Sequence, residues 1–126
     1  MDGADPIGRT DMRKSLIVAL ILAGLPGAAL AHHGWGSYDS SKVFTIKSPV
    51  EALDWHNPHV TITVKHEGQS WQATLAPISR MQRRGLSEAM LAPGKDVAVE
   101  GYPSTRVERE MRAERITVGD KVFELR

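Results

Sequence analysis

A short apolar segment near the N-terminus decides how much of this 126-residue chain is available to fold. The pair Arg13-Lys14 precedes an apolar run over residues 16–25, Pro26-Gly27 end that run, and small residues lead up to Ala31. A positive region, a short apolar region and a small-x-small ending are the three parts of a secretory signal peptide. About ten apolar residues are too few for a bilayer core, which needs about twenty. The sequence therefore predicts a signal cleaved after Ala31 and a mature protein that is periplasmic or secreted.

After cleavage the chain consists of residues 32–126, and we expect these to form one small domain preceded by a flexible, Gly/Ser-rich arm over 32–42. Residues 1–31 are then an N-terminal extension plus the signal, with Met1 and Met12 both candidate start residues. A buried core helix and a membrane anchor are the other interpretations of the apolar run. Nothing later in the chain is apolar enough to span a membrane, so we expect no membrane span after cleavage.

Composition removes several function classes. The chain has no cysteine, which excludes disulfides, thiolate metal sites and thiol nucleophiles. A small exported domain without disulfides depends on a well-closed β core, a bound ligand or a partner. Removing residues 1–31 takes away three basic and three acidic residues, so the formal charge stays at +1. Such a balance gives no broad basic footprint, and we expect no nucleic-acid partner.

Alternating polar and β-branched residues indicate the strands. The clearest strand is predicted over residues 59–66, where every second residue is apolar. A turn at 67–69 leads to a second arm over 71–75, which completes a hairpin. Residues 43–55 are also strand-like, but Ser48-Pro49 interrupts them, which indicates an edge position or a bulge.

Residues 77–91 differ in character, because their apolar residues recur at helical spacing with arginines between them. Gly85 is expected to end a first short helix and Ser87 to cap a second. Residues 97–101 alternate again and predict another strand. Residues 106–115 carry mixed charges that would suit a solvated helix. The strand–turn–strand pattern that follows favours instead a long strand whose first half is charged and exposed.

The predicted order is three strands, a helix and two strands. This is the element order of a five-stranded Greek-key barrel of the OB type, with one helical insert between the third and fourth strands. Closing the sheet hides its edges, which suits a small protein without disulfides. An open sheet with a helix packed on one face is the alternative fold.

Histidines are the most informative candidates for chemistry. If cleavage follows Ala31, His32 becomes the first residue, and its free α-amine and imidazole can chelate one metal ion. Nitrogen ligands favour copper first and zinc second among divalent ions. Such a chelate resembles the copper "histidine brace", which needs a second histidine from elsewhere in the fold.

That histidine is predicted to come from the turn Trp55-His56-Asn57-Pro58-His59, because Asn-Pro is a strong turn signal. The predicted metal ligands are therefore His32, His33, His56 and His59. Asp54 could orient one of the imidazoles, or it could be an ordinary turn carboxylate. The plainer alternative is that the turn only shapes the chain, with His32 and His33 in a solvated tail.

The arginines and serines are weaker candidates for functional residues than the histidines. The cluster Arg80, Arg83 and Arg84 could bind an anionic polymer, although a solvated helix face is the simpler interpretation. Cysteine is absent and the serines lie in no nucleophile-like context, so covalent catalysis has no starting point. We therefore favour a binding protein over an enzyme.

Three segments together resemble a family of small exported bacterial proteins known as a domain of unknown function. They are Ala31-His32-His33-Gly34, the turn 55–59 with its Asn57-Pro58-His59, and residues 84–101 with Pro93-Gly94. The resemblance covers nearly the whole mature chain. It implies a signal-bearing periplasmic protein and assigns no reaction.

Two functions are consistent with these observations. The first is a periplasmic protein that binds a divalent transition metal, copper first and zinc second, through its N-terminal and turn histidines. The second is a non-metal interaction module of the cell envelope that binds a protein, peptide or glycan.

Overall fold

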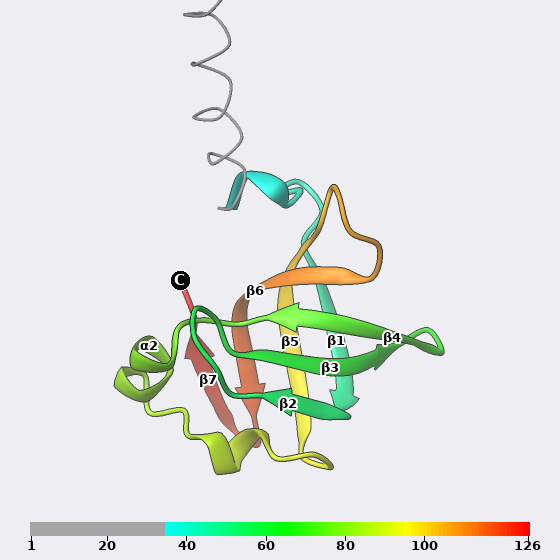
Figure 1. The fold of residues 1–126 in the computed structure, drawn as a ribbon. Helices are drawn as coiled ribbons and strands as arrows, with labels where there is room; N and C mark the ends of the chain where they lie inside the picture. The colour runs from blue at the N-terminus through cyan, green and yellow to red at the C-terminus, as the bar shows by residue number, and fades with distance from the viewer. Residues whose placement is uncertain (1–34) are drawn as a thin grey trace, which may run out of the picture. The chain divides into compact units, whose positions relative to one another are not determined.

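The strands form one sheet that returns to its own starting point in the computed structural model, which describes residues 35–126 (Figure 1). The predicted signal, its cleavage site and the candidate ligands His32 and His33 lie outside the described residues. The strands are β1 (Phe44–Pro49), β2 (Ala52–Asp54), β3 (Thr61–His66), β4 (Gln69–Thr74), β5 (Asp96–Pro103), β6 (Glu110–Val118) and β7 (Lys121–Glu124). Three short helices complete the domain: η2 (Trp35–Ser37), α2 (Ile78–Arg83) and η3 (Glu88–Leu91).

The sheet order is β1-β5-β6-β4-β3-β2, with β7 paired to β6. All neighbours are antiparallel except β4 and β6, which are parallel. Because β1 and β2 follow each other along the chain, the path ends beside the strand where it began. This is a closed, OB-like barrel, and the predicted mostly-β class and OB-like arrangement are confirmed.

The number of strands differs from the prediction, because the sheet has seven and not five. The predicted break near Ser48-Pro49 divides the first strand into β1, which pairs with β5, and β2, which pairs with β3. At the bend, the Ser48 hydroxyl accepts a hydrogen bond from the Lys65 amide at 2.9 Å, and the Glu51 amide donates to the Thr63 carbonyl at 2.8 Å. The bent segment therefore joins both ends of the sheet. Strand β7 is the second strand beyond the predicted five. It follows β6 after a turn at Gly119 and pairs with it antiparallel.

The helical insert lies between β4 and β5, as predicted. Gly85 follows α2 with a φ of +86°, a left-handed conformation that glycine adopts without strain. Met81, Leu86 and Leu91 are fully buried, so the insert contributes its apolar side chains to the same core as the strands. The period-two pattern of the predicted hairpin is also confirmed, since Val60, Ile62 and Val64 are buried.

A long strand is present, but the prediction that its exposed, charged first half begins at residue 106 is wrong. Residues 105–109 form a turn, in which Arg109 has a φ of +53°, and β6 begins only at Glu110. Within β6 the pairing with β5 shifts, so that Glu100 faces Arg115 but Gly101 faces Ala113 and Glu114 is unpaired. Such a β-bulge bends its strand and increases the local twist. The bend lets β6 pair with β5, β4 and β7.

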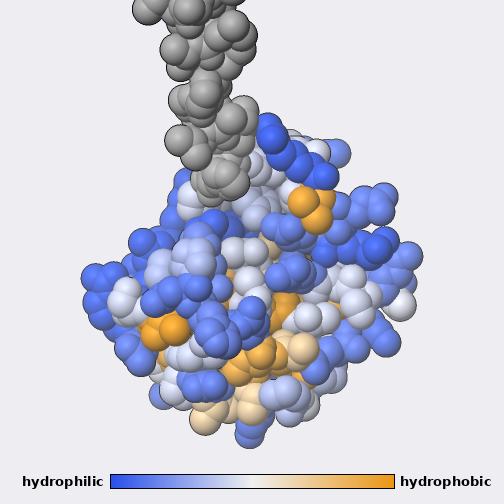
Figure 2. Space-filling view, in the orientation of Figure 1, coloured by the Kyte–Doolittle hydropathy of each residue, from blue (hydrophilic) through white to orange (hydrophobic). Residues whose placement is uncertain are grey.

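Where a flexible arm was expected, residues 35–42 are hydrogen-bonded to the domain. The Asp39 amide donates to the Pro103 carbonyl and the Thr105 amide to the Ser37 carbonyl, both at 2.9 Å. Tyr38 forms an isolated bridge with Ser104. Among residues 35–126 no helix is long and apolar enough to cross a membrane. The surface in Figure 2 is mostly hydrophilic, with small separate hydrophobic patches.

Candidate functional site

The turn between β2 and β3 carries the two predicted histidine ligands that the structure describes. The Asn57–Pro58 peptide bond is cis. The Asn57 side-chain oxygen accepts a hydrogen bond from the Ile78 amide at 3.1 Å, which attaches the turn to the first residue of α2. Trp55 packs against the core. Contacts on both sides therefore fix the turn, and the side chains of its two histidines project from a backbone of defined position.

His56 is the more accessible of the two, with 81% of its side chain exposed. Its Nδ1 atom pairs with an oxygen of Asp54, two residues earlier at the end of β2. When Nδ1 donates its proton to a carboxylate, the tautomer is fixed and the lone pair of Nε2 is free. Metal-ligating histidines are commonly held in this way. His56 therefore offers a free, oriented nitrogen at the surface.

His59 lies in different surroundings. Its Nε2 atom is 3.5 Å from the Nη2 atom of Arg112. Partial burial lowers the pKa of His59, and the positive charges of Arg112 and Arg80 lower it further. Both effects favour the neutral imidazole, whose Nε2 lone pair can accept a hydrogen bond from the Arg112 N–H. The same positive charges oppose a cation at this nitrogen.

The structure does not gather the described histidines into a complete metal site. Within residues 35–126 no group of three or more histidine, aspartate or glutamate side chains is placed to hold a metal ion. The third described histidine, His66, lies near the β3–β4 turn, where its ring packs against Phe44 and Trp71. Of the predicted set, the described residues therefore supply His56 and His59 and leave the remaining ligands to positions 32 and 33.

Arg112 is the residue that sequence reasoning missed. It was expected to be exposed, yet it is 7% exposed and its guanidinium lies 4.6 Å from the centre of the Trp35 ring. No carboxylate forms an ion pair with it in the described part of the chain, and its Nε atom has no hydrogen-bond partner there. Buried arginines are ordinarily paired. Arg112 is therefore unusual among buried arginines, because its described contacts are the His59 nitrogen and the Trp35 ring and include no carboxylate.

Further arginines lie near Arg112. Arg80, Arg83, Arg84 and Arg126 line a cavity of about 420 Å³, and the Arg126 guanidinium is 4.5 Å from the Trp35 ring centre. The sequence singled out the three arginines of the α2 region, but it gave no sign that Arg126 and Arg112 would join them. We call the four residues that line the cavity the arginine pocket, with Arg112 beside it.

An aromatic corner lies elsewhere, around the start of β1. Phe44 and Trp71 contact each other edge to face, with ring centres 5.3 Å apart, and His66 packs against both. With Lys42, Val43, Glu67 and Pro103 these rings line a cavity of about 340 Å³. Val43 is 55% exposed at its edge.

Tyr38 connects the segment before β1 to β6. Its hydroxyl donates a hydrogen bond to Glu110 at 2.9 Å. Burial raises the pKa of Tyr38, and the neighbouring Glu110 carboxylate raises it further, because both disfavour the phenolate. This contact holds the strand that carries Arg112 against the segment that carries Trp35.

Comparison with solved structures agrees with the barrel assignment. The crystal structure of the S. pombe Stn1–Ten1 complex contains a chain that is similar over 63% of this chain and 59% of its own length, with 17% identity and a TM-score of 0.51. A TiaS–tRNA–ATP complex matches over 71% of this chain and 20% of its own, with 18% identity and a TM-score of 0.44. The present chain thus spans less than two thirds of either protein chain. At this identity the first likeness shows the fold alone.

The fold and the turn define a small OB-like barrel domain with histidines and arginines on its surface. Residues 19–122 match the family of unknown function DUF6152, and the chain belongs to this family. The predicted membership of a domain family of unknown function is confirmed. A search of curated proteins found no match to the sequence.

Proposed function

We propose that the protein is an exported, periplasmic binding protein for a divalent transition metal, with copper preferred over zinc. His56 is the ligand from the barrel, and His32 and His33 supply further nitrogens once the signal has been removed. His59 is the fourth candidate ligand. Export rests on the signal-like segment that ends at Ala31.

The observation that carries this proposal is the pairing of Asp54 with His56. The carboxylate accepts a hydrogen bond from Nδ1, which leaves Nε2 free to coordinate a metal ion. The side chain is exposed, so a metal ion can reach it without opening the barrel. One histidine is not a site, and the remaining nitrogens must come from the N-terminal residues.

Copper is preferred because of the kind of ligands that are offered. An α-amine and imidazoles are all nitrogen donors, and among divalent ions Cu(II) binds most tightly to such a set. Without cysteine the protein has no thiolate that would select another metal. His59 contributes less than His56 in this proposal, because Arg112 already occupies its Nε2 side and repels a cation.

Calorimetric titration of the protein beginning at His32 tests the proposal. Cu(II) is expected to bind close to one ion per chain. His56→Ala should weaken the affinity strongly, and Asp54→Asn should weaken it about 10- to 100-fold, which is the usual effect of losing the partner that orients a ligand. His66→Ala is the matched control and should leave the affinity unchanged. Affinity in the millimolar range only, or equal losses in the His56 and His66 variants, would refute it.

Mass spectrometry of the protein isolated from its native cells tests the other half of the proposal. We expect a mature N-terminus at His32. A protein that keeps residues before His32 lacks the free α-amine, and the copper chelate then cannot form as proposed.

The aromatic corner favours a second function, an envelope interaction module that binds a protein, peptide or glycan. Edge-exposed Val43 and the rings of Phe44 and Trp71 present apolar surface beside a cavity. Capture of a periplasmic partner in excess chelator, lost in Trp71→Ala but retained in His56→Ala, would support this function. Capture that disappears with chelator would instead support a metal-bridged contact.

A further inference from the structure

The arginine pocket has an unusual charge balance. Arg80, Arg83 and Arg84 form no ion pair with an aspartate or glutamate side chain among residues 35–126, and Arg126 has one such partner, Glu114, at 3.6 Å. The surface over the helical insert is mostly hydrophilic (Figure 2). The four arginines that line the cavity therefore outnumber the carboxylates that contact them. Such like charges repel each other, and the repulsion falls when an anion binds between them.

The pocket is held in place by the main chain and is more than a solvated helix face. Arg80 and Arg83 share a face of α2 with Arg84, which follows the helix. The Arg80 guanidinium donates to the Leu125 main-chain oxygen and the Arg84 guanidinium to the Arg126 main-chain oxygen, each at 3.2 Å. These bonds keep the two cations beside the last strand. Side chains that are already ordered lose less entropy when they bind a ligand.

Arg112 adds a buried positive charge beside this group. It is 93% buried, and its Nε atom lacks a hydrogen-bond partner among the described residues. Burial lowers the pKa of Arg112, and the nearby positive charges of Arg80 and Arg126 lower it further. Desolvation of a guanidinium without a carboxylate partner is costly. Arg112 does not line the cavity, but its charge adds to the positive potential that an anion in the cavity would meet.

We propose that the arginine pocket binds a ligand that carries a diphosphate group. Guanidinium groups match phosphate oxygens in pairs of parallel hydrogen bonds. One carboxylate would neutralise only one of the arginines, whereas each terminal phosphate brings about −1.5 to −2 charges at pH 7 and three acceptor oxygens. The cavity of about 420 Å³ is of the size of a small-ligand site. The diphosphate can belong to a soluble compound or to a lipid headgroup.

Titration of the full-length mature protein with inorganic pyrophosphate tests this site. The buffer contains excess chelator, so that neither the copper site nor metal–pyrophosphate complexes contribute. We expect saturable binding that Arg83→Gln weakens about tenfold or more, the loss expected for one charge-assisted contact. Glu114→Gln removes the carboxylate that competes for Arg126 and should strengthen binding.

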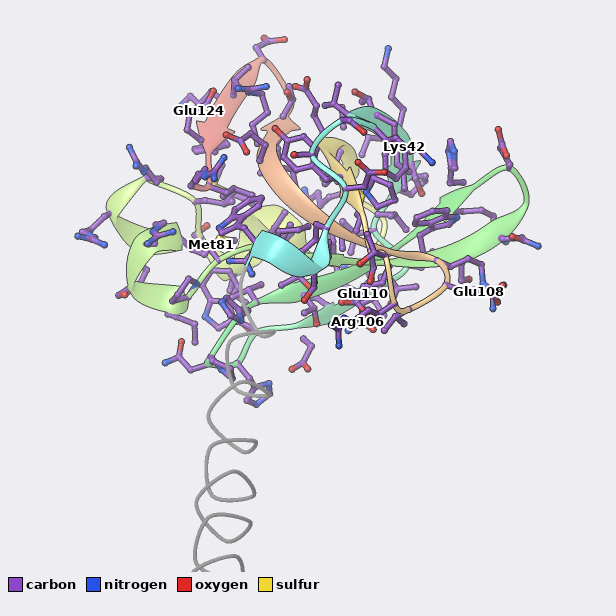
Figure 3. The ribbon with its side chains drawn as sticks, turned by 90° about the horizontal axis from the view of Figure 1, so that it is seen from above. Lys42, Met81, Arg106, Glu108, Glu110 and Glu124 are labelled. Atoms are coloured by element: carbon purple, nitrogen blue, oxygen red, sulfur yellow. The ribbon has the colours of Figure 1, made fainter. Side chains whose placement is uncertain are left out.

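Matched controls lie on the turn between β5 and β6. Arg106 and Glu108 are exposed there, on the opposite side of the domain from α2 in both Figure 1 and Figure 3. Arg106→Gln changes the net charge as Arg83→Gln does, and Glu108→Gln as Glu114→Gln does. Both control variants should bind pyrophosphate within about twofold of the unchanged protein, because screening limits attraction over that distance.

The source of the diphosphate is distinguished in a second arm, with phosphatidylcholine vesicles that contain or lack a lipid bearing a diphosphate headgroup. Binding of free pyrophosphate indicates a soluble ligand. Binding to the diphosphate vesicles alone, sensitive to Arg83→Gln, indicates a lipid ligand. The proposal is overturned if neither probe binds below millimolar concentration, or if the Arg106 and Arg83 variants lose affinity equally. Neither result affects the copper proposal, because the chelator keeps copper off the protein in this experiment.

Discussion

Gly101 lies where β5 and β6 approach each other most closely, and its replacement by alanine is the sharpest test of the barrel geometry. A Cβ atom at this position would lie 2.0 Å from the Arg112 carbonyl oxygen, 2.8 Å from its carbonyl carbon and 2.9 Å from the Ala113 Cα. All three atoms belong to the main chain of the partner strand, so no side-chain rotation can relieve the contact. The strands must separate at the bulge by more than an ångström.

The cost can be placed on an energy scale. Overpacking a core costs about 1–3 kcal/mol and occasionally more, and a clash with two main-chain residues belongs at the upper end of that range. We therefore expect Gly101→Ala to lower the free energy of unfolding by about 3 kcal/mol or more. The whole domain has about 5–14 kcal/mol at the usual stability per residue. At about 4–8 °C for each kcal/mol, the Tm should fall by about 12–24 °C.

Urea unfolding followed by tryptophan fluorescence and circular dichroism measures the change. The urea midpoint should fall while the m-value stays constant, as expected for a loss of stability without a change in the surface exposed on unfolding. Gly36→Ala is the control, because a Cβ at Gly36 meets nothing within 4 Å, and it should change stability by less than about 0.5 kcal/mol. If Gly101→Ala stays within about 1 kcal/mol of the unchanged protein, the close approach of β5 and β6 is wrong.

Three further outcomes are expected. Met81→Ala should destabilise the domain by about 2–5 kcal/mol in the same assay, because Met81 is a fully buried residue of α2; a loss near zero would place it outside the core. Asn57→Ala should cost about 0.5–1.5 kcal/mol through the lost bond to the Ile78 amide, and an unchanged urea midpoint would contradict that contact. The fold raises the pKa of Tyr38. The contribution of Tyr38 to the free energy of unfolding is therefore constant below its unfolded-state pKa of about 10 and is lost as pH rises above that pKa. Tyr38→Phe should remove this alkaline loss, measured as the urea midpoint against pH; an identical loss in both proteins would refute the shift.

The sequence predicted the parts of the fold that depend on local patterns. Alternation at Val60, Ile62 and Val64 located β3, because one face of that strand is buried and the other is not. Gly85 marked the end of α2, since a left-handed conformation there favours glycine. Ser48-Pro49 marked the bend between β1 and β2.

The sequence did not predict the parts that depend on contacts between distant segments. The bulge at Glu114 shifts the inward-facing phase of β6, so Ala113 and Ile116 both face the core although three positions separate them. Arg112 precedes the bulge and lies between Met111 and Ala113, and it is buried because the distant Trp35 ring covers it. The consecutive charges Glu114-Arg115 between two apolar residues were the signal of a phase change.

The candidate sites divide in the same way. The Asn57-Pro58 turn signal correctly located a turn between two strands. Asp54 had two interpretations, a carboxylate that orients an imidazole or an ordinary turn carboxylate, and its contact with His56 favours the first. The arginine pocket forms only because the C-terminal residues contact the α2 region, more than forty positions earlier in the sequence. No local pattern carries that information. The metal ligands at His32 and His33 stay a prediction.

Trp35 and Arg126 are the first and last described residues, and the guanidinium of one lies 4.5 Å from the ring centre of the other. The two ends of the barrel domain are therefore neighbours in space. A short linker could join them, and new ends could be opened at the exposed Glu67-Gly68 turn without altering the order of strands in the sheet. The same closeness makes the domain suitable for insertion into a surface loop of another protein, where entry and exit points must lie side by side.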